Sequence, residues 1–354
     1  MVDETPQHRK PVTIYDVARE AGVAASTVSR TFSRPGRVTA ATNERVHRAA
    51  AKLGYRAKPI FRPEKGVATK MLAFVVADIA NPVYSHIMKG FQEEATQNGY
   101  TVLLIDSTED GQAEHQAIQS VLHLVDGLAL TASRLSDSAI NQVVKITPVV
   151  AVNRIIAGLP SVVPDTPRGM RRAVEHLATL GHTRLTYLSG PAASWADGVR
   201  WRAVSEACFE LNLHARRVGP NVPSIQGGFD AAAAWREHPT SAVMAFNDIM
   251  AIGFMKSVQR SGLRVPDDVS VIGVDNSISS VLTTPTLTTV ASSTSLIGAR
   301  AARALIGQLQ RRSADTAEII VAPMDLIARE SSGPRSENFP PQPSKGDTDV
   351  PRSP

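Results

Sequence analysis

The sequence predicts an α/β protein in which a small all-helical head precedes a larger body of two Rossmann-like lobes. From Met71 onward, short apolar runs alternate with longer helical stretches, a pattern typical of parallel sheets with helices on both faces. The first 70 residues instead hold short amphipathic segments broken by a glycine turn. A chain of 354 residues is long enough for two or three compact units.

Basic charge is concentrated at the start of the chain. Residues 1–70 hold 14 Lys and Arg against 6 Asp and Glu, a balance of +8, whereas the whole chain carries +5, which leaves −3 for the rest. A basic head on a slightly acidic body suggests that the head meets a polyanion. Charge alone does not separate nucleic acid from anionic lipid, and it also fits a merely soluble basic surface.

The head, residues 1–55, is expected to begin with a capped helix. Thr13 is placed to cap it, and Asp16 lies in the first turn, where the helix dipole favours an acidic side chain. The apolar residues that follow at helical spacing are Ile14, Val17, Ala18 and Ala21. Gly22 then permits a left-handed turn at low cost.

A second short helix is expected from Ala25 to Phe32, with Val28 and Phe32 on its inner face. After a Pro-Gly break, Thr39 can cap a third helix. The apolar face of that helix is Val46, Ala49, Ala50 and Leu53. Three short helices in this order match a helix-turn-helix, whose second helix enters the DNA major groove. The alternative is a structural helical hairpin.

The outer face of the second helix carries side chains suited to DNA. Arg30 is long enough to pair with guanine O6 and N7, Ser26 can bond to several bases, and Ala25 offers a methyl group to thymine. Contacts to phosphates set register but not sequence. The residues expected to make them are Thr13, Tyr15, Thr27, Ser29, Ser33 and Arg37.

The stretch VTIYDVAREAGVAASTVSRTFSRPGRVTAATNERVHRAAAKLGY, residues 12–55, resembles the DNA-binding domain of the LacI/GalR (lactose repressor) family of bacterial transcription factors. The resemblance continues to about Glu330. In that family the first two residues of the recognition helix and the Arg near its end read bases, which implies the same role for Ala25, Ser26 and Arg30. The family's usual Ser or Thr cap on this helix is replaced by a weak one, Ala24.

The linker, residues 56–70, departs from the family pattern. Family members usually form a hinge helix here, and its Leu opens a minor-groove base step. In this chain Phe61 and Glu64 stand at the usual Ala and Leu positions, and two nearby prolines restrict any helix. One hypothesis is that Ile60 or Phe61 supplies the apolar wedge, beside the basic Lys58. The alternative is a stiff basic linker that contacts only phosphates.

The body, residues 71–330, is expected to contain more strands than one sheet holds comfortably. The predicted strands are 71–78, 101–106, 127–132, 148–153, 185–190, 242–247 and 269–275. The predicted helices are Val83–Asn98, Ala113–Leu124, Pro167–Leu180, Val199–Leu211 and Ile249–Ser261. Ligands of such sheets bind at the carboxyl ends of the strands. That rule places a cleft beside Asp78, Asp106, Thr131, Asn153, Gly190, Asn247 and Asp275.

The body also resembles the family's effector-binding core, itself similar to periplasmic sugar-binding proteins, in segments such as 77–84 and 264–276. The resemblance implies that Arg200, Asn247 and Asp275 anchor a small polyhydroxyl molecule through hydrogen bonds. The other expected contacts are an apolar wall of Tyr84, Trp195 and Phe246, and the loop-end residues Asn81, Arg154 and Asp165. The strand-end Asp and Asn side chains have an alternative interpretation as caps of helices or turns.

Several classes of protein and site are disfavoured. Residues 331–354, rich in Pro, Ser and charge, are expected to form a disordered tail. A single cysteine, Cys208, excludes an internal disulfide, and the scattered histidines lack ligand spacing, so neither a metal nor a cofactor is expected. Neither a secretory signal nor a membrane span is evident, so a cytoplasmic protein is expected. The GxGxxG, GxxxxGKS/T and GxSxG signatures are missing, which argues against an enzyme.

The sequence therefore predicts a cytoplasmic, homodimeric regulator of transcription, in the first instance a repressor. We expect it to bind a roughly palindromic double-stranded operator and to respond to a small-molecule effector, a sugar or related polyol, in the cleft of residues 71–330, where it also dimerises. No membrane partner is expected. The main alternative is a small-molecule binding protein without a DNA-regulatory role, and a second is an enzyme of doubly wound fold.

Overall fold

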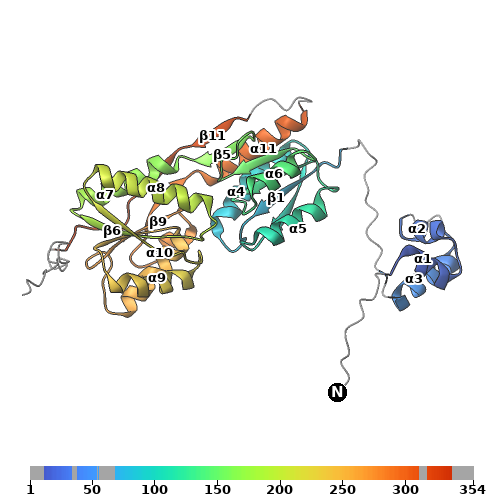
Figure 1. Cartoon of the computed structure of the whole chain (residues 1–354), viewed down its shortest axis with the longest axis horizontal. Helices are drawn as coiled ribbons and strands as arrows, with labels where there is room; N and C mark the ends of the chain where they lie inside the picture. The colour runs from blue at the N-terminus through green and yellow to red at the C-terminus, as the bar shows by residue number, and fades with distance from the viewer. Residues whose placement is uncertain (1–11, 34–37, 54, 56–67, 311–316, 337–354) are drawn as a thin grey trace, which may run out of the picture. The chain divides into compact units, whose positions relative to one another are not determined.

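The computed structural model describes residues 12–33, 38–53, 55, 68–310 and 317–336, and the chain divides into two compact units, residues 1–67 and 68–354 (Figure 1). The first unit, the head, is all-helical in its described part. The second unit, the body, contains two sheets with helices packed on them. Both fold classes agree with the prediction.

The head consists of α1 (Ile14–Ala21), α2 (Ala25–Ser33) and α3 (Ala40–Leu53). Gly22 follows α1 in the left-handed conformation, with φ 62°, which glycine adopts without strain. Val17, Val28 and Val46, one from each helix, are fully buried at the centre of the core. The predicted inner faces of the three helices are thus the faces that pack together.

Contacts at the ends of the helices close this small core. The Phe32 ring lies edge-on to His47, with 5.0 Å between ring centroids, and 6.0 Å from the ring of Tyr55. The Nζ atom of Lys52 on α3 lies 2.6 Å from Oε1 of Glu20 on α1. The head therefore supplements a core of valines and alanines with aromatic and charged contacts between helices.

The N-terminal lobe of the body is a six-stranded parallel sheet in the order β11-β5-β4-β3-β1-β2. Its strands are β1 (Met71–Val76), β2 (Thr101–Asp106), β3 (Gly127–Thr131), β4 (Val149–Val152), β5 (Ser161–Pro164) and β11 (Ile319–Ala322). Its helices are α4 (Pro82–Gln97), α5 (Gly111–Val121), α6 (Asp137–Val144) and α11 (Thr294–Gln310). The central strands β3 and β4 are buried throughout, as strands covered on both faces must be.

The C-terminal lobe is a second six-stranded sheet in the order β12-β10-β9-β8-β6-β7. Its strands are β6 (Arg184–Leu188), β7 (His214–Val218), β8 (Ala242–Ala245), β9 (Ser270–Val274), β10 (Thr288–Ser292) and β12 (Met324–Ile327). Its helices are α7 (Thr166–Thr179), α8 (Trp195–Glu210), α9 (Ile225–Glu237), α10 (Asp248–Arg260) and the 3-10 helix η2 (Ile278–Val281). The edge strand β12 pairs antiparallel with β10, and the other strands pair in parallel.

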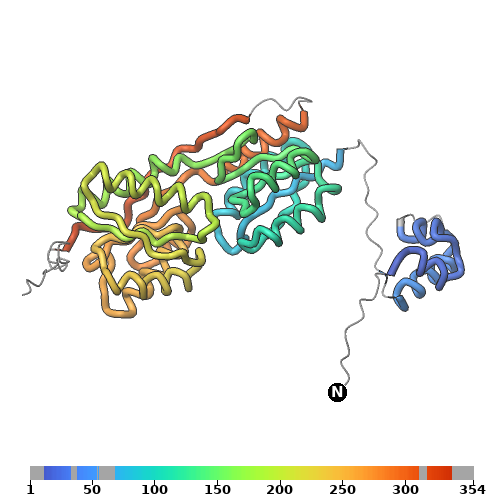
Figure 2. Tube along the Cα trace, in the orientation of Figure 1, coloured from blue at the N-terminus to red at the C-terminus, as the bar shows by residue number. Residues whose placement is uncertain are grey.

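The chain passes between the two lobes three times, from β5 to α7, from β10 to α11 and from β11 to β12 (Figure 2). The crossings leave from the carboxyl ends of β5 and β10. Because the neighbouring strands are parallel to these, the carboxyl edge of each sheet faces the other lobe. The predicted pair of lobes is confirmed, and the carboxyl ends of the strands meet between them.

The body extends beyond the predicted boundary at residue 330. Ser331 is fully buried, and its N–H donates to the carbonyl of Thr286 at 2.9 Å while its hydroxyl donates to the carbonyl of Val271 at 2.5 Å. The expectation of disorder from Ser331 onward is therefore wrong for residues 331–336. Polar groups of this segment form hydrogen bonds with the C-terminal sheet and the loop beside it, and amino-acid composition does not reveal such contacts. Residues 337–354 lie outside the described residues.

Candidate functional site

The exposed face of α2 carries the predicted base readers. Ser26 and Arg30 are exposed, Ala25 is half-buried, and Val28 points to the core on the opposite side. Thr31 is buried, and its hydroxyl donates to the carbonyl of Thr27 at 2.9 Å. Arg30 and Ser26 can therefore project toward a DNA groove, while Val28 packs the opposite side of the helix against the core of the head.

The start of α2 lacks a side-chain cap from the residue that precedes it. The carbonyl of Ala24 accepts from the N–H of Thr27 at 2.8 Å and of Val28 at 3.2 Å, and alanine offers no side-chain oxygen. The first helix is better capped, because the carboxylate of Asp16 accepts from the N–H of Thr13 at 2.9 Å and from its hydroxyl at 2.6 Å. These hydrogen bonds lower the pKa of Asp16.

The remaining predicted DNA contacts are placed only in part. Tyr15 is 69% exposed on α1, Thr13 is exposed, and Thr27 and Ser29 are half-buried on α2. The side chain of Ser33 and the residues Arg37, Lys58, Ile60 and Phe61 lie outside the described part of the chain. The wedge hypothesis for the linker therefore stays a prediction.

In the body, Arg200 of α8 is the centre of a polar site on the C-terminal lobe. Its guanidinium donates to the carbonyl of Phe246 at 2.5 Å, lies 4.6 Å from the centroid of the Phe246 ring, and lies 3.5 Å from Oδ1 of Asp275. Its side chain is only 11% exposed, and its Nε has no partner among the described residues. Arg200 therefore retains a buried donor that a ligand can satisfy.

Asp275 follows β9 and stands in a strained turn, with φ 114°, followed by Asn276 with φ 53°. Burial raises the pKa of Asp275 to about 7, an effect that the Arg200 charge opposes and the Asp248 charge strengthens. The carboxylate of Asp248 holds the turn by accepting from the N–H of Ser277 at 2.7 Å. A buried carboxylate with so high a pKa lacks hydrogen-bond donors, which ligand hydroxyls can provide.

Asn247 and Phe246 complete the C-terminal side of the site. Asn247 caps α10, because its Oδ1 accepts from the N–H of Met250 at 3.0 Å, yet its Nδ2 is buried without a partner in the described residues. Phe246 packs against Gly190, where a β-carbon would lie 2.6 Å from the ring. Only glycine at this turn lets the ring lie flat under Arg200.

Tyr84 of α4 is a buried residue whose phenol is influenced by charged groups of both lobes. The residue is 8% exposed, and burial raises the pKa of its phenol, with Glu109 as the next largest cause. Arg134 from the same lobe and Asp275 and Arg200 from the other lobe also act on it. Charged groups of both lobes therefore act on one aromatic side chain.

Thr131 and Asn153, which the strand-end rule places beside the cleft, lie at the carboxyl ends of β3 and β4 in the N-terminal lobe. Thr131 ends β3 and is 1% exposed, and Asn153 follows β4 with φ 58°. Thr131 Oγ1 and Asn153 Oδ1 are buried without partners in the described part of the chain. Neither residue was among the expected ligand contacts, although the strand-end rule names both as neighbours of the cleft.

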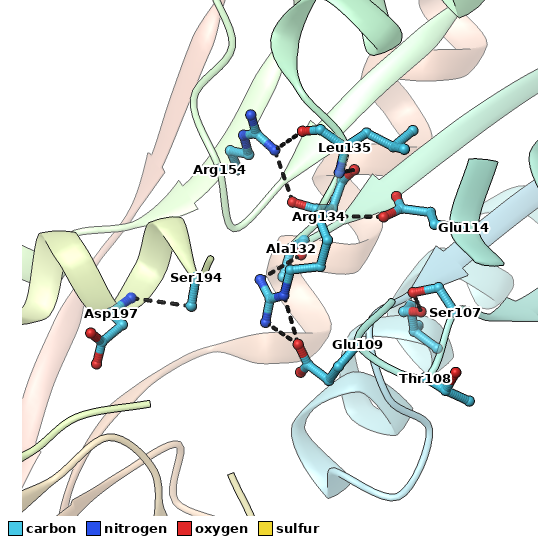
Figure 3. A network of polar contacts seen from close by, with 12 residues as sticks. Ser107, Thr108, Glu109, Glu114, Ala132, Arg134, Leu135, Arg154, Ser194 and Asp197 are labelled. Atoms are coloured by element: carbon cyan, nitrogen blue, oxygen red, sulfur yellow. Dashed lines mark hydrogen bonds and ion pairs between the residues drawn. The ribbon is translucent and has the colours of Figure 1, made fainter. Parts of the chain in front are cut away.

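Sequence reasoning missed a buried ion pair on the same lobe (Figure 3). Arg134 is 5% exposed, donates to the Ala132 carbonyl at 2.9 Å and pairs with Glu109, while its own N–H donates to Glu114 at 2.8 Å. This pair joins the loops that follow β2 and β3, in which Thr108, Glu109 and Ala132 all have positive φ. Nothing in the sequence pattern singles out residues of two separate loops.

The weaker predicted contacts have structural roles. Asn81 caps α4 by accepting from Val83 N–H at 3.2 Å, and Asp165 caps α7 by accepting from Arg168 N–H at 3.4 Å. Arg154 donates to the carbonyls of Ser133 and Leu135 and pairs with Asp137. The interpretation as caps, left open from sequence, fits Asn81 and Asp165, and the contact of all three residues with an effector stays untested.

Trp195 is not brought to the other predicted wall residues. It lines a separate hollow of about 480 Å³ whose other residues are Pro167, Gly198, Val199, Arg202, Ala203 and Glu206. Pro167 belongs to α7, and the other residues share one face of α8, whereas Arg200 lies on the opposite face. The prediction that Trp195 forms a wall beside Arg200 is therefore not supported.

The described residues contain no group of three or more His, Cys, Asp or Glu that could hold a metal ion. Cys208 is buried, and burial raises the pKa of its thiol to about 12. Over the same described ranges, no helix combines the length and apolarity of a membrane span.

Two family models match the chain: "Bacterial regulatory proteins, lacI family" over residues 13–58 and "Periplasmic binding protein-like domain" over residues 174–332. The transcriptional regulator DegA of Bacillus subtilis is 31% identical over 91% of this chain and 98% of its own length. The ribose operon repressor of Halalkalibacterium halodurans is 30% identical over 92% and 99%. A lac repressor dimer, solved with operator and the anti-inducer ONPF, has a TM-score of 0.68 at 27% identity and covers 92% of this chain and 100% of its own.

Proposed function

The chain belongs to the LacI family of bacterial regulatory proteins, and we propose on that basis that it is a sequence-specific transcriptional repressor controlled by a small polyhydroxyl effector. The head binds operator DNA through α2, and the cleft between the lobes binds the effector. Because the effector and the operator act on the same protein, each changes the affinity of the other by the same factor.

One observation carries the assignment of the cleft. Thr131, Asn153, Arg200 and Asn247 come from both lobes, and each has a buried polar atom without a partner among the described residues. Buried polar atoms without hydrogen bonds cost free energy, so a molecule that supplies both donors and acceptors binds with a gain. Neighbouring sugar hydroxyls do both.

The base-reading role is assigned to Ala25, Ser26 and Arg30, supported by the exposure of Ser26 and Arg30 over a core-facing Val28. Arg30 supplies the bidentate contact that discriminates most strongly between bases. Thr13, Tyr15, Thr27 and Ser29 serve the phosphates, which fix the register of the head on the duplex.

A homodimer with two heads suits a roughly palindromic operator. We propose that the copies meet through exposed apolar side chains at the start of α9 and around η2. These are Val222, Ile225, Ile278, Val281 and Leu282, which are 45–76% exposed. A large apolar patch on a monomer marks an interaction surface. Ile225→Asp with Leu282→Asp should shift the protein toward monomer in sedimentation, whereas Phe209→Asp, at an exposed apolar site on α8, should not.

The test of the proposal combines the selection of operator sequences with a measurement of how sugars change operator affinity. Operator sequences selected from random duplexes should share a two-fold motif, and one sugar of a panel that includes D-ribose should change their affinity for the protein. Asp275→Ala should retain operator binding and lose the sugar response. Equal, purely salt-dependent binding to every duplex would refute the DNA-binding role, and turnover of a bound sugar would refute our further proposal that the chain is not an enzyme.

A further inference from the structure

Asp197 of α8 is a buried carboxylate that takes hydrogen bonds from three separate parts of the C-terminal lobe. Its side chain is 2% exposed. It accepts from the Tyr187 hydroxyl at 2.9 Å, from the Gly190 N–H at 2.7 Å, and from the guanidinium of Arg217. The first two partners belong to β6 and the turn after it, and the third belongs to the edge strand β7.

This carboxylate is linked to the effector site by direct contacts. The Gly190 N–H that it holds belongs to the residue on which the Phe246 ring rests, since a β-carbon at Gly190 would lie 2.6 Å from that ring. The Phe246 carbonyl and ring in turn seat the Arg200 guanidinium. Asp197 also lies one helical turn before Arg200, beside the Ser194 cap of α8 (Figure 3).

Arg217 supplies the positive charge that faces the Asp197 carboxylate. A buried carboxylate without a countercharge is strongly disfavoured, and an ionised acceptor makes shorter and stronger hydrogen bonds than a neutral one. Arg217 approaches from the rim of the lobe, where its own side chain is 39% exposed. It touches neither Arg200 nor Asp275 in the described hydrogen bonds and ion pairs.

We propose that Arg217 and Asp197 form a positioning pair for the effector site, in which the Arg217 charge holds Asp197, and Asp197 fixes the Gly190 turn on which Phe246 and Arg200 are seated. The pair binds no effector atom. This inference rests on the proposed function of the cleft, and it adds a residue on the outer edge of the lobe to the determinants of effector affinity.

The chain offers a matched control on the same strand. Side chains alternate along a strand, so Arg216 points to the opposite face of the sheet, where it donates to the Thr186 hydroxyl at 3.0 Å and to the Trp235 carbonyl at 3.2 Å. Arg216→Ala therefore removes a side chain of the same size from the same strand without touching Asp197. Arg217→Lys keeps the positive charge at the pair.

The deciding experiment measures amide exchange by mass spectrometry in the full-length protein without ligand. In Arg217→Ala, exchange in the peptide that contains Gly190 should accelerate roughly tenfold, because its buried acceptor has lost a charged partner. Arg217→Lys should restore most of the protection, and Arg216→Ala should leave this peptide as in wild type. Equal exchange in Arg217→Ala and wild type, or equal acceleration in the two alanine variants, would overturn the proposal.

A second readout separates positioning from general stability. The probe is D-ribose, or the panel sugar that stabilises wild type most in a thermal-shift screen. Arg217→Ala should raise the sugar concentration needed for half-maximal operator response roughly tenfold, with operator affinity in the absence of sugar unchanged. A change in operator affinity alone would contradict the assignment. A wild-type protein that responds to no sugar would count against the function of the cleft, and the exchange experiment would still decide on Arg217.

Discussion

The Arg200–Asp275 pair leads to a prediction about how stability depends on pH. Replacing Arg200 with Met removes the hydrogen bond to the Phe246 carbonyl, the stacking on that ring and the charge 3.5 Å from Asp275, and keeps a long apolar side chain. The first two losses should cost about 1–3 kcal/mol at any pH. The loss of the charge should act through the protonation of Asp275.

The sign follows from the raised pKa of Asp275. Its pKa is 3.8 in the unfolded chain and about 7 in the folded protein, so between these pH values the folded state binds a proton that the unfolded state has lost. The free energy of unfolding therefore falls as the pH rises from 3.8 to 7. Above pH 7 the contribution of Asp275 is about 4 kcal/mol lower than below pH 3.8. Arg200 lowers the pKa of Asp275 in the wild type, so in Arg200→Met this pKa rises further. Above pH 7 the variant should then keep losing stability, by about 1.4 kcal/mol per pH unit, while this group no longer affects the wild type.

Urea unfolding of both proteins at pH 7, 8 and 9 measures this difference. Asp248, whose pKa burial raises to about 6, titrates below this window in both proteins. By pH 9 the gap should approach the 3–5 kcal/mol typical of a broken buried pair. The double variant Arg200→Met, Asp275→Asn should show a gap that does not change with pH. A pH-independent gap in the single variant would refute the assignment of the high pKa to Asp275.

Further predictions concern the head, the C-terminal segment and the ligand. Arg30→Ala should cost about 1–3 kcal/mol in operator binding and relax one base position, measured by selection of preferred sequences; an unchanged preference would remove Arg30 from the readers. Asp16→Ala should lower the free energy of unfolding of the head through loss of the cap bonds to Thr13, measured by calorimetry. Burial lowers the pKa of His182, which contacts the Gly333 carbonyl at 3.1 Å, so the contribution of this imidazole to the stability of the body should fall as pH drops below 6.5, and His182→Gln should remove that contribution from the pH dependence measured in thermal scans. Sugar hydroxyls that donate to Asp275 should lower its pKa, so effector binding should release a proton near pH 7 and tighten from pH 6 to 7, which calorimetry in buffers of different ionisation enthalpy would detect.

The fold was largely predictable because its central strands are continuous apolar runs. All seven predicted strands are present, as β1, β2, β3, β4, β6, β8 and β9. The strands that were missed carry mixed polarity or are short. For example, β7 reads His-Ala-Arg-Arg-Val at the edge of its sheet, and only Val218 of its five residues is buried. Apolar periodicity reports burial, so it finds the centre of a sheet and misses its edges.

The candidate site was predictable where a residue's position along its strand decides its role. Asn247 and Asp275 follow parallel strands, and Arg200 was found by resemblance, and the structure places all three together. Trp195 was misplaced because its role depends on which face of α8 it occupies, and α8 has no clear apolar side in the sequence. An aromatic residue near a helix start gives no sign of the direction in which it points.

The Arg217–Asp197 pair shows why part of such a site is invisible in sequence. The two residues are 20 positions apart, one on a helix and one on an edge strand. Each is a charged residue of a type that usually lies at the protein surface. Only the fold makes the carboxylate buried and gives it the Gly190 N–H as a further partner. The residues that touch a ligand can be inferred from the ends of strands, because topology fixes those positions. The residues that hold them in place depend on contacts between elements, and these follow only from the three-dimensional arrangement.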